Sequence, residues 1–78
     1  MALQAGQLGR VVHLEDEPAE LYAQLVAAGL YPGMELRLVE QSDREIRFWA
    51  EGREHALTPV LAANISVVPL PLSPELAP

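Results

Sequence analysis

The sequence predicts a mainly β fold: a small, partly open barrel of about five strands with one short helix between strands 1 and 2. Three observations support this prediction. Short segments with alternating apolar residues lie on both sides of one helical stretch, Gly-Leu-Tyr-Pro-Gly at residues 29–33 ends that stretch, and Glu51-Gly52 is typical of a hairpin turn. The chain has 78 residues, 50% of them apolar, which suffices for one small domain.

Three segments are expected along the chain. Residues 1–8 show little periodicity and are expected to form a loose N-terminal entry. Residues 9–69 contain the predicted barrel. Residues 70–78 carry a proline at every third or fourth position, a spacing that forbids helix and sheet and favours extended polyproline II. We therefore expect this proline-rich tail to be disordered or docked on a partner.

The first strand is expected at residues 9–15, with Val12 and Leu14 on its inner side. The further strands are expected at residues 34–39, 44–50, 55–58 and 65–68, with a single helical turn at 60–63 before the last strand. Their alternation places one set of side chains in the core: Met34, Leu36, Leu38, Ile46, Phe48, Ala50 and Leu57.

The helix is expected to follow an acidic stretch. Asp16 or Glu17 should cap it and Pro18 should occupy its first position, because proline has no N–H to lose there. Helical spacing predicts an apolar stripe of Leu21, Tyr22, Leu25 and Val26. Gly29 should end the helix in the left-handed conformation, with Leu30 folding back onto Leu25.

Composition excludes several classes of function. A net charge of −6, with five arginines and no lysine, argues against direct binding to a nucleic acid backbone. The absence of cysteine excludes disulfides, thiolate metal sites and cysteine nucleophiles. No apolar run approaches the roughly 20 residues that span a bilayer, so we expect a cytoplasmic protein without membrane insertion. No catalytic motif occurs, so no enzyme is expected.

Two segments together resemble a known family. They are Gly9-Arg-Val-Val with Leu25-Val-Ala-Ala-Gly-Leu-Tyr-Pro-Gly33, and the closing Leu57-Thr-Pro-Val-Leu-Ala-Ala-Asn-Ile-Ser-Val67. This pattern resembles the SH3-like, FeoA-type domain found in ferrous iron transport A proteins and at the C-terminus of metal-dependent repressors of the diphtheria toxin repressor family. The acidic entry at residues 15–20 and the short turn at 41–43 favour the repressor branch. A stand-alone ferrous iron transport A protein, which would bind a membrane iron transporter, is the alternative.

The repressor resemblance implies a partner and a metal. The domain would pack on the dimerisation domain of its own parent repressor, and DNA would be bound only through a winged helix absent from this chain. An oxygen ligand for Mn²⁺ or Fe²⁺ would come from Glu15, Asp16 or Glu17, with His13 as a neighbouring candidate, and the other ligands from the parent protein. Carboxylates suit such ions. The competing interpretation is that the acids only complement the helix dipole and that His13, like His55, is a surface strand residue.

Trp49 and Tyr31 are candidate protein-interaction residues. SH3-like domains dock proline-rich segments on exposed aromatic rings, and Trp49 falls on the outward side of its predicted strand. The chain's own tail, or that of a neighbouring copy, is a proline-rich segment available for such docking. The competing interpretation is that Trp49 covers the edge of the barrel.

Overall fold

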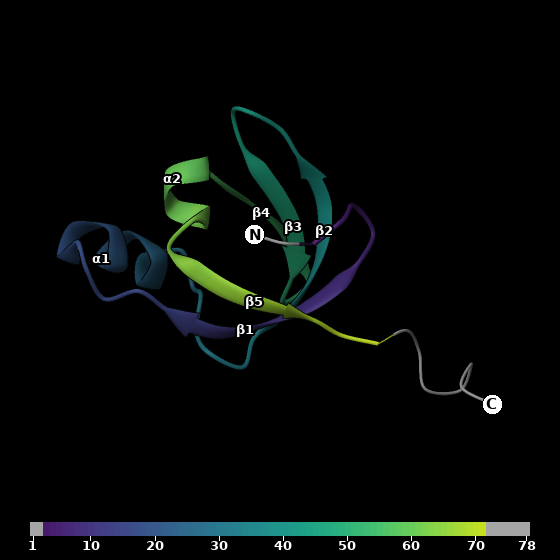
Figure 1. The fold of residues 1–78 in the computed structure, drawn as a ribbon, viewed down its shortest axis with the longest axis horizontal. Helices are drawn as coiled ribbons and strands as arrows, with labels where there is room; N and C mark the ends of the chain where they lie inside the picture. The colour runs from purple at the N-terminus through teal and green to yellow at the C-terminus, as the bar shows by residue number, and fades with distance from the viewer. Residues whose placement is uncertain (1–2, 72–78) are drawn as a thin grey trace.

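The computed structural model describes residues 3–71, which form one curled antiparallel sheet with two short helices (Figure 1). The elements in chain order are β1 (Leu8–Leu14), α1 (Ala19–Ala27), β2 (Glu35–Gln41), β3 (Ile46–Ala50), β4 (Arg53–Leu57), α2 (Pro59–Ala62) and β5 (Ile65–Pro69). The strand order is β4-β3-β2-β1-β5. The prediction of a mainly β, partly open barrel with a helix between the first two strands is confirmed.

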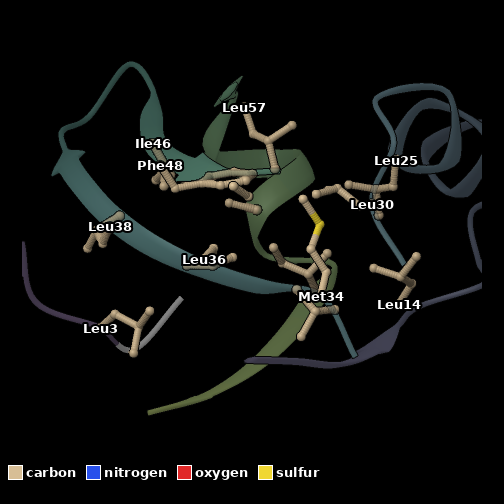
Figure 2. Close-up of a cluster of buried hydrophobic side chains, with 14 residues drawn as sticks. Leu3, Leu14, Leu25, Leu30, Met34, Leu36, Leu38, Ile46, Phe48 and Leu57 are labelled. Carbon is tan, nitrogen blue, oxygen red and sulfur yellow. The ribbon is translucent and has the colours of Figure 1, made fainter. Parts of the chain in front are cut away.

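The inner face of the sheet carries a continuous apolar core (Figure 2). Phe48 on β3 is its largest fully buried side chain. The seven side chains predicted to face inward in the strands after the helix are all buried: Met34, Leu36, Leu38, Ile46, Phe48, Ala50 and Leu57. The regular alternation of β2 and β3 therefore predicted the core correctly, since successive side chains of a strand point to opposite faces.

The inward residues of β1 differ from the prediction. Val12 was predicted on the inner side, but its side chain is 48% exposed, whereas Val11 is fully buried. The cause is an irregularity in the pairing of β1 with β5 between Val11 and His13, where two steps along β1 match one along β5. Such a bulge inserts one residue and reverses the alternation beyond it. Leu14 is buried as predicted.

Helix α1 begins one residue later than predicted. Pro18 is the N-cap rather than the first helical residue, and no side chain caps the helix, so the prediction of an Asp16 or Glu17 cap is wrong. The predicted apolar stripe is narrower than expected, because Leu25 alone is fully buried while Tyr22 and Val26 are exposed.

The end of α1 is the predicted corner. Gly29 has φ +91° and its N–H donates to the carbonyl of Val26, while the N–H of Leu30 donates to the carbonyl of Leu25 at 3.2 Å. These two bonds define a Schellman motif, and the burial of Leu30 supplies its apolar contact. Gly33, with φ +98°, then turns the chain into β2.

Several strand ends differ from those predicted. β4 begins at Arg53, two residues before the predicted start at 55, and β3 begins at Ile46 rather than 44. Glu51 and Gly52, both with positive φ, make the predicted hairpin turn. The described part of the predicted N-terminal entry contacts the sheet: Leu3 is buried in the core, and the N–H of Gly6 donates to the carbonyl of Leu38 at 2.7 Å. Of the predicted tail, residues 72–78 lie outside the described residues.

Candidate functional site

The end of β1 brings two of the predicted metal-site residues together. His13 and Glu15 are two positions apart, and Nε2 of His13 lies 3.4 Å from Oε1 of Glu15. Both side chains are more than half exposed. The backbone N–H of Glu15 donates to the carbonyl of Asn64 at 2.8 Å, which holds this end of β1 against the chain just before β5. The pair is thus a nitrogen and an oxygen donor on one accessible surface.

Asp16 and Glu17 are not part of this pair. They lie exposed in the connection between β1 and α1. Within residues 3–71, no group of three or more His, Asp or Glu side chains is close enough to hold a metal ion. The donor chemistry of His13 and Glu15 fits Mn²⁺ or Fe²⁺, but Mn²⁺ commonly takes an octahedral set of ligands. This pair alone could supply only part of such a site.

The two predicted interaction aromatics lie on different segments, Trp49 on β3 and Tyr31 in the corner after α1. Trp49 on β3 is 51% exposed. Tyr31, in the corner after α1, donates a hydrogen bond from its hydroxyl to the carboxylate of Glu51. That hydrogen bond, followed by desolvation and the negative charge of Glu51, raises the pKa of Tyr31 above its ordinary value. The corner and the hairpin are therefore linked by a side-chain contact.

A shallow groove of about 230 Å³ lies on the outer face of the sheet beside Trp49. Its lining residues come from the starts of β1 and β2, from the end of β3 and from the turn after it: Leu8, Glu35, Leu36, Arg37, Trp49, Ala50 and Glu51. Leu8 pairs with Arg37, and Arg37 pairs with Trp49, so these three residues form one row across β1, β2 and β3. The sequence predicted Trp49 but not Leu8 or Arg37, because the row depends on strand register. The outward position of Arg37 in the alternation of β2 was the available signal.

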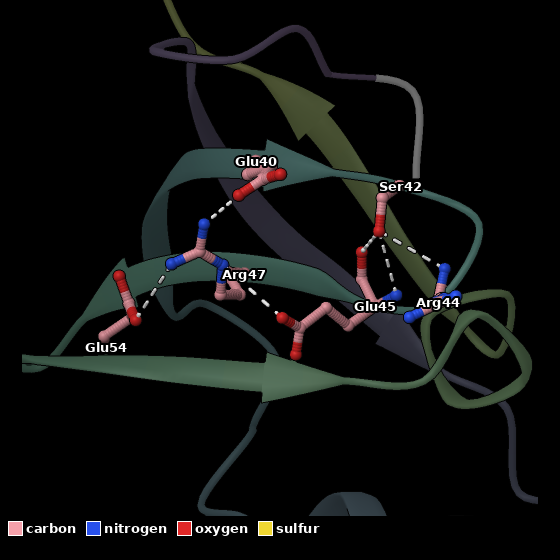
Figure 3. Close-up of polar contacts among 6 residues, drawn as sticks. All are labelled: Glu40, Ser42, Arg44, Glu45, Arg47 and Glu54. Atoms are coloured by element: carbon pink, nitrogen blue, oxygen red, sulfur yellow. Dashed lines mark hydrogen bonds and ion pairs between the residues drawn. The ribbon is translucent and has the colours of Figure 1, made fainter.

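A separate acidic cluster surrounds Arg47 on the same sheet (Figure 3). The guanidinium contacts the carboxylates of Glu40, Glu45 and Glu54, the last two at 3.6 and 3.5 Å. The guanidinium occupies the point on which the three carboxylates converge and offsets part of their negative charge, so we do not treat this cluster as a cation site. This cluster joins β2, β3 and β4 and has a structural role.

His55 on β4 also has a structural role. Its ring stacks on that of Phe48 with centroids 5.1 Å apart, and its Nε2 lies 3.2 Å from the carbonyl oxygen of Ala50. The side chain is half-buried rather than on the surface as predicted.

Known structures show the same fold. An iron uptake regulatory protein (FeoA) superimposes with a TM-score of 0.77 at 26% identity, over 88% of this chain and 92% of that one. A manganese-dependent transcriptional repressor in complex with manganese gives 0.82 at 22% identity, over 88% of this chain and 34% of that one. A FeoA-like protein from Clostridium acetobutylicum gives 0.80 at 16% identity, over 92% and 85%. This chain therefore spans about a third of the repressor's length.

No curated protein matches the sequence. None of the helices within residues 3–71 is long and apolar enough to cross a membrane.

The model of the FeoA domain family matches residues 1–69, which is most of the chain and includes every strand described above. The same SH3-like sheet occurs in solved proteins that are named for FeoA. The chain therefore belongs to the FeoA domain family.

Proposed function

We propose that this FeoA domain is a non-enzymatic interaction module of a manganese- or iron-dependent transcriptional repressor. It packs on the metal-binding and dimerisation domain of its parent protein and lends a ligand to a metal site shared with that domain. The observation that carries this proposal is the exposed pair of His13 and Glu15. These two donors could complete a metal site only with further ligands from another domain. The fold of the manganese-dependent repressors supports it.

Glu15 is the stronger candidate ligand of the pair. Manganese and ferrous ions favour carboxylate oxygens, and neutral imidazole is a further common ligand for such ions. The backbone N–H of Glu15 donates to the carbonyl of Asn64, and this hydrogen bond fixes the backbone from which the Glu15 side chain extends. His13 lies beside it and would act as a second donor or as a hydrogen-bond partner that orients the carboxylate. A bound metal would supply charge at this junction and favour the docked arrangement.

The surface next to the junction suits a protein partner. Helix α1 follows the junction directly, and its exposed face carries Tyr22 and Val26 one turn apart. An amphipathic helix with apolar side chains at i and i+4 presents a ridge that another helical surface can cover. The donors and the apolar ridge are thus supplied by adjacent segments of the chain.

The test is metal-dependent association. The chain is titrated with the winged-helix and dimerisation part of a manganese-dependent repressor that lacks its own C-terminal domain, with and without Mn²⁺, and the anisotropy of Trp49 is recorded. Association should require Mn²⁺, should be weakened at least about tenfold by Glu15→Gln, as is typical of losing a metal contact, and should be unchanged by the control Glu17→Gln. Association independent of Mn²⁺, or tight stoichiometric binding of Mn²⁺ by this chain alone, would overturn the shared site.

The second candidate is a ferrous iron transport accessory protein. It is favoured by the similarity to an iron uptake regulatory protein FeoA, of which this chain covers 92% at 26% identity. In that role the domain would bind the cytoplasmic part of a membrane iron transporter. Binding of the chain to such a cytoplasmic part, together with no binding to the repressor, would favour this candidate over the first.

A further inference from the structure

The end of the described chain lies beside the groove at Trp49. β5 pairs with β1, Gly9 is opposite Pro69, and the N–H of Leu70 donates to the carbonyl of Leu8 at 2.9 Å. Leu8 also lines the groove. Leu8, Arg37 and Trp49 form one row across β1, β2 and β3. Leu70 is bonded to Leu8, so it lies at the β1 end of this row. Whatever follows Leu70 therefore leaves the sheet at one end of the groove.

The residues after Leu70 have the composition that such a groove recognises. The sequence continues Pro71-Leu-Ser-Pro74-Glu75-Leu-Ala-Pro78, which contains a P-x-x-P segment. Segments of this kind prefer polyproline II and dock on grooves lined by aromatic rings, because little conformational entropy is lost on binding. Trp49, half exposed on the groove wall, is the aromatic ring available to such a segment.

The distances match as well. Strands lie about 4.8 Å apart, so the three steps from β5 to β3 cover roughly 14 Å. Polyproline II advances about 3.1 Å per residue, so about five residues reach from Leu70 to Trp49. A tail that followed this row would therefore span it with residues 71–75.

The charge of the groove fits this segment. The ion pairs within residues 3–71 involve Arg10, His13 and Arg47, so Arg37 has no carboxylate partner in that part of the chain. The two acids of the groove are engaged: Glu35 pairs with Arg10, and Glu51 accepts the hydroxyl of Tyr31. Arg37 therefore offers a cation in the middle of the groove, and Glu75 is the acid of the tail.

We propose that residues 71–75 dock in the groove lined by Leu8, Arg37 and Trp49 of the same chain, as an internal ligand that occupies this face of the domain. Docking within one chain needs little intrinsic affinity, because a short tether gives an effective concentration on the order of mM. The proposal is independent of the proposed function, which uses the other end of β1. It implies that an external proline-rich segment would have to displace the tail before it could bind here.

Trp49 is the single tryptophan, so its fluorescence reports on the groove directly. We compare acrylamide quenching of the full chain with that of residues 1–71. The full chain should show a quenching constant lower by about two-fold and emission at shorter wavelength, because a docked proline covers an exposed face of the indole. A synthetic peptide of residues 70–78, added to the shortened chain, should restore the protection at concentrations on the order of mM.

Matched variants of the full chain test the contacts. Pro71→Ala combined with Pro74→Ala should behave like the shortened chain, whereas Ser73→Ala should not. On the groove side, Arg37→Gln should raise the quenching constant and the control Arg44→Gln should leave it unchanged. Equal quenching in the full and shortened chains would overturn the proposal. A protection that grows with protein concentration would also overturn it, because the tail would then enter the groove of a second copy.

Discussion

Gly9 is the position at which an added methyl group should be most costly. A Cβ placed there would lie 2.6 Å from Cδ1 of Leu3, 2.7 Å from Cγ1 of Val67 and 3.2 Å from the carbonyl oxygen of Val68. Gly9 is not among the glycines with positive φ, so alanine can adopt its backbone conformation. The effect of Gly9→Ala is therefore one of packing, and it measures how firmly Leu3 is held against β1.

Two opposing contributions decide whether Gly9→Ala raises or lowers the free energy of unfolding. Replacing glycine by alanine at a compatible backbone position stabilises a protein by about 0.4–1 kcal/mol through the unfolded state. Overpacking a core typically costs about 1–3 kcal/mol. Leu3 is buried and Val67 is packed against the core, so neither contact is relieved freely. We expect Gly9→Ala to lower the free energy of unfolding by about 1.5 kcal/mol, a large share of the total in a small domain.

The assay is urea unfolding followed by Trp49 fluorescence. With a slope of about 1 kcal/mol per M, the midpoint should fall by about 1.5 M. Leu3→Val removes the atom at 2.6 Å, so in that background the cost of Gly9→Ala should shrink by about 1 kcal/mol, the coupling expected for residues in contact. Additive effects, within about 0.3 kcal/mol, would show that Leu3 does not press on β1 and would refute the reasoning.

Three further predictions follow from local contacts. Gly29→Ala should lower the free energy of unfolding by about 1 kcal/mol, measured in urea, because a left-handed residue with a Cβ is strained. Arg47→Gln should cost about 0.5 kcal/mol, more at low salt, because its carboxylate partners then repel one another, whereas Arg44→Gln should cost nothing. Absorbance titration should show Tyr31 ionising above pH 10.0, with Glu51→Gln lowering its pKa. Because the folded pKa is raised, the contribution of this hydrogen bond to stability is complete below the unfolded pKa and is lost as pH rises through the folded one.

Local patterns in the sequence predicted the parts of the fold that depend on neighbouring residues. The corner at residues 29–33 follows from the backbone freedom of its two glycines, and its Schellman bonds use only residues within six positions. The core positions of β2 and β3 follow from regular alternation. The prediction of a side-chain cap for α1 was wrong because Pro18 itself occupies the N-cap position. Proline has no side-chain oxygen that could accept a hydrogen bond from the helix N-terminus.

Features that depend on strand register could not be predicted from the sequence. The row of Leu8, Arg37 and Trp49 joins residues that are 29 and 12 positions apart, and it exists because β1 pairs with β2 and β2 with β3 in one particular alignment. Shifting either alignment by one residue would turn a different set of side chains outward. The indole alone was predictable as an exposed contact, whereas the cation and the leucine that complete the groove were not.

The bulge in β1 connects the wrong prediction at Val12 to the candidate metal pair. Counting from Val11, which is fully buried, regular alternation would place His13 in the core. The extra residue, Val12, shifts the alternation so that His13 faces solvent on the side of Glu15, while Leu14 returns to the core. An exposed valine is the cost of this arrangement, and bulges are over-represented where a side chain must be redirected to a functional site. The error at Val12 and the pairing of His13 with Glu15 therefore have one cause, which is why the candidate site could be named from the sequence but its geometry could not.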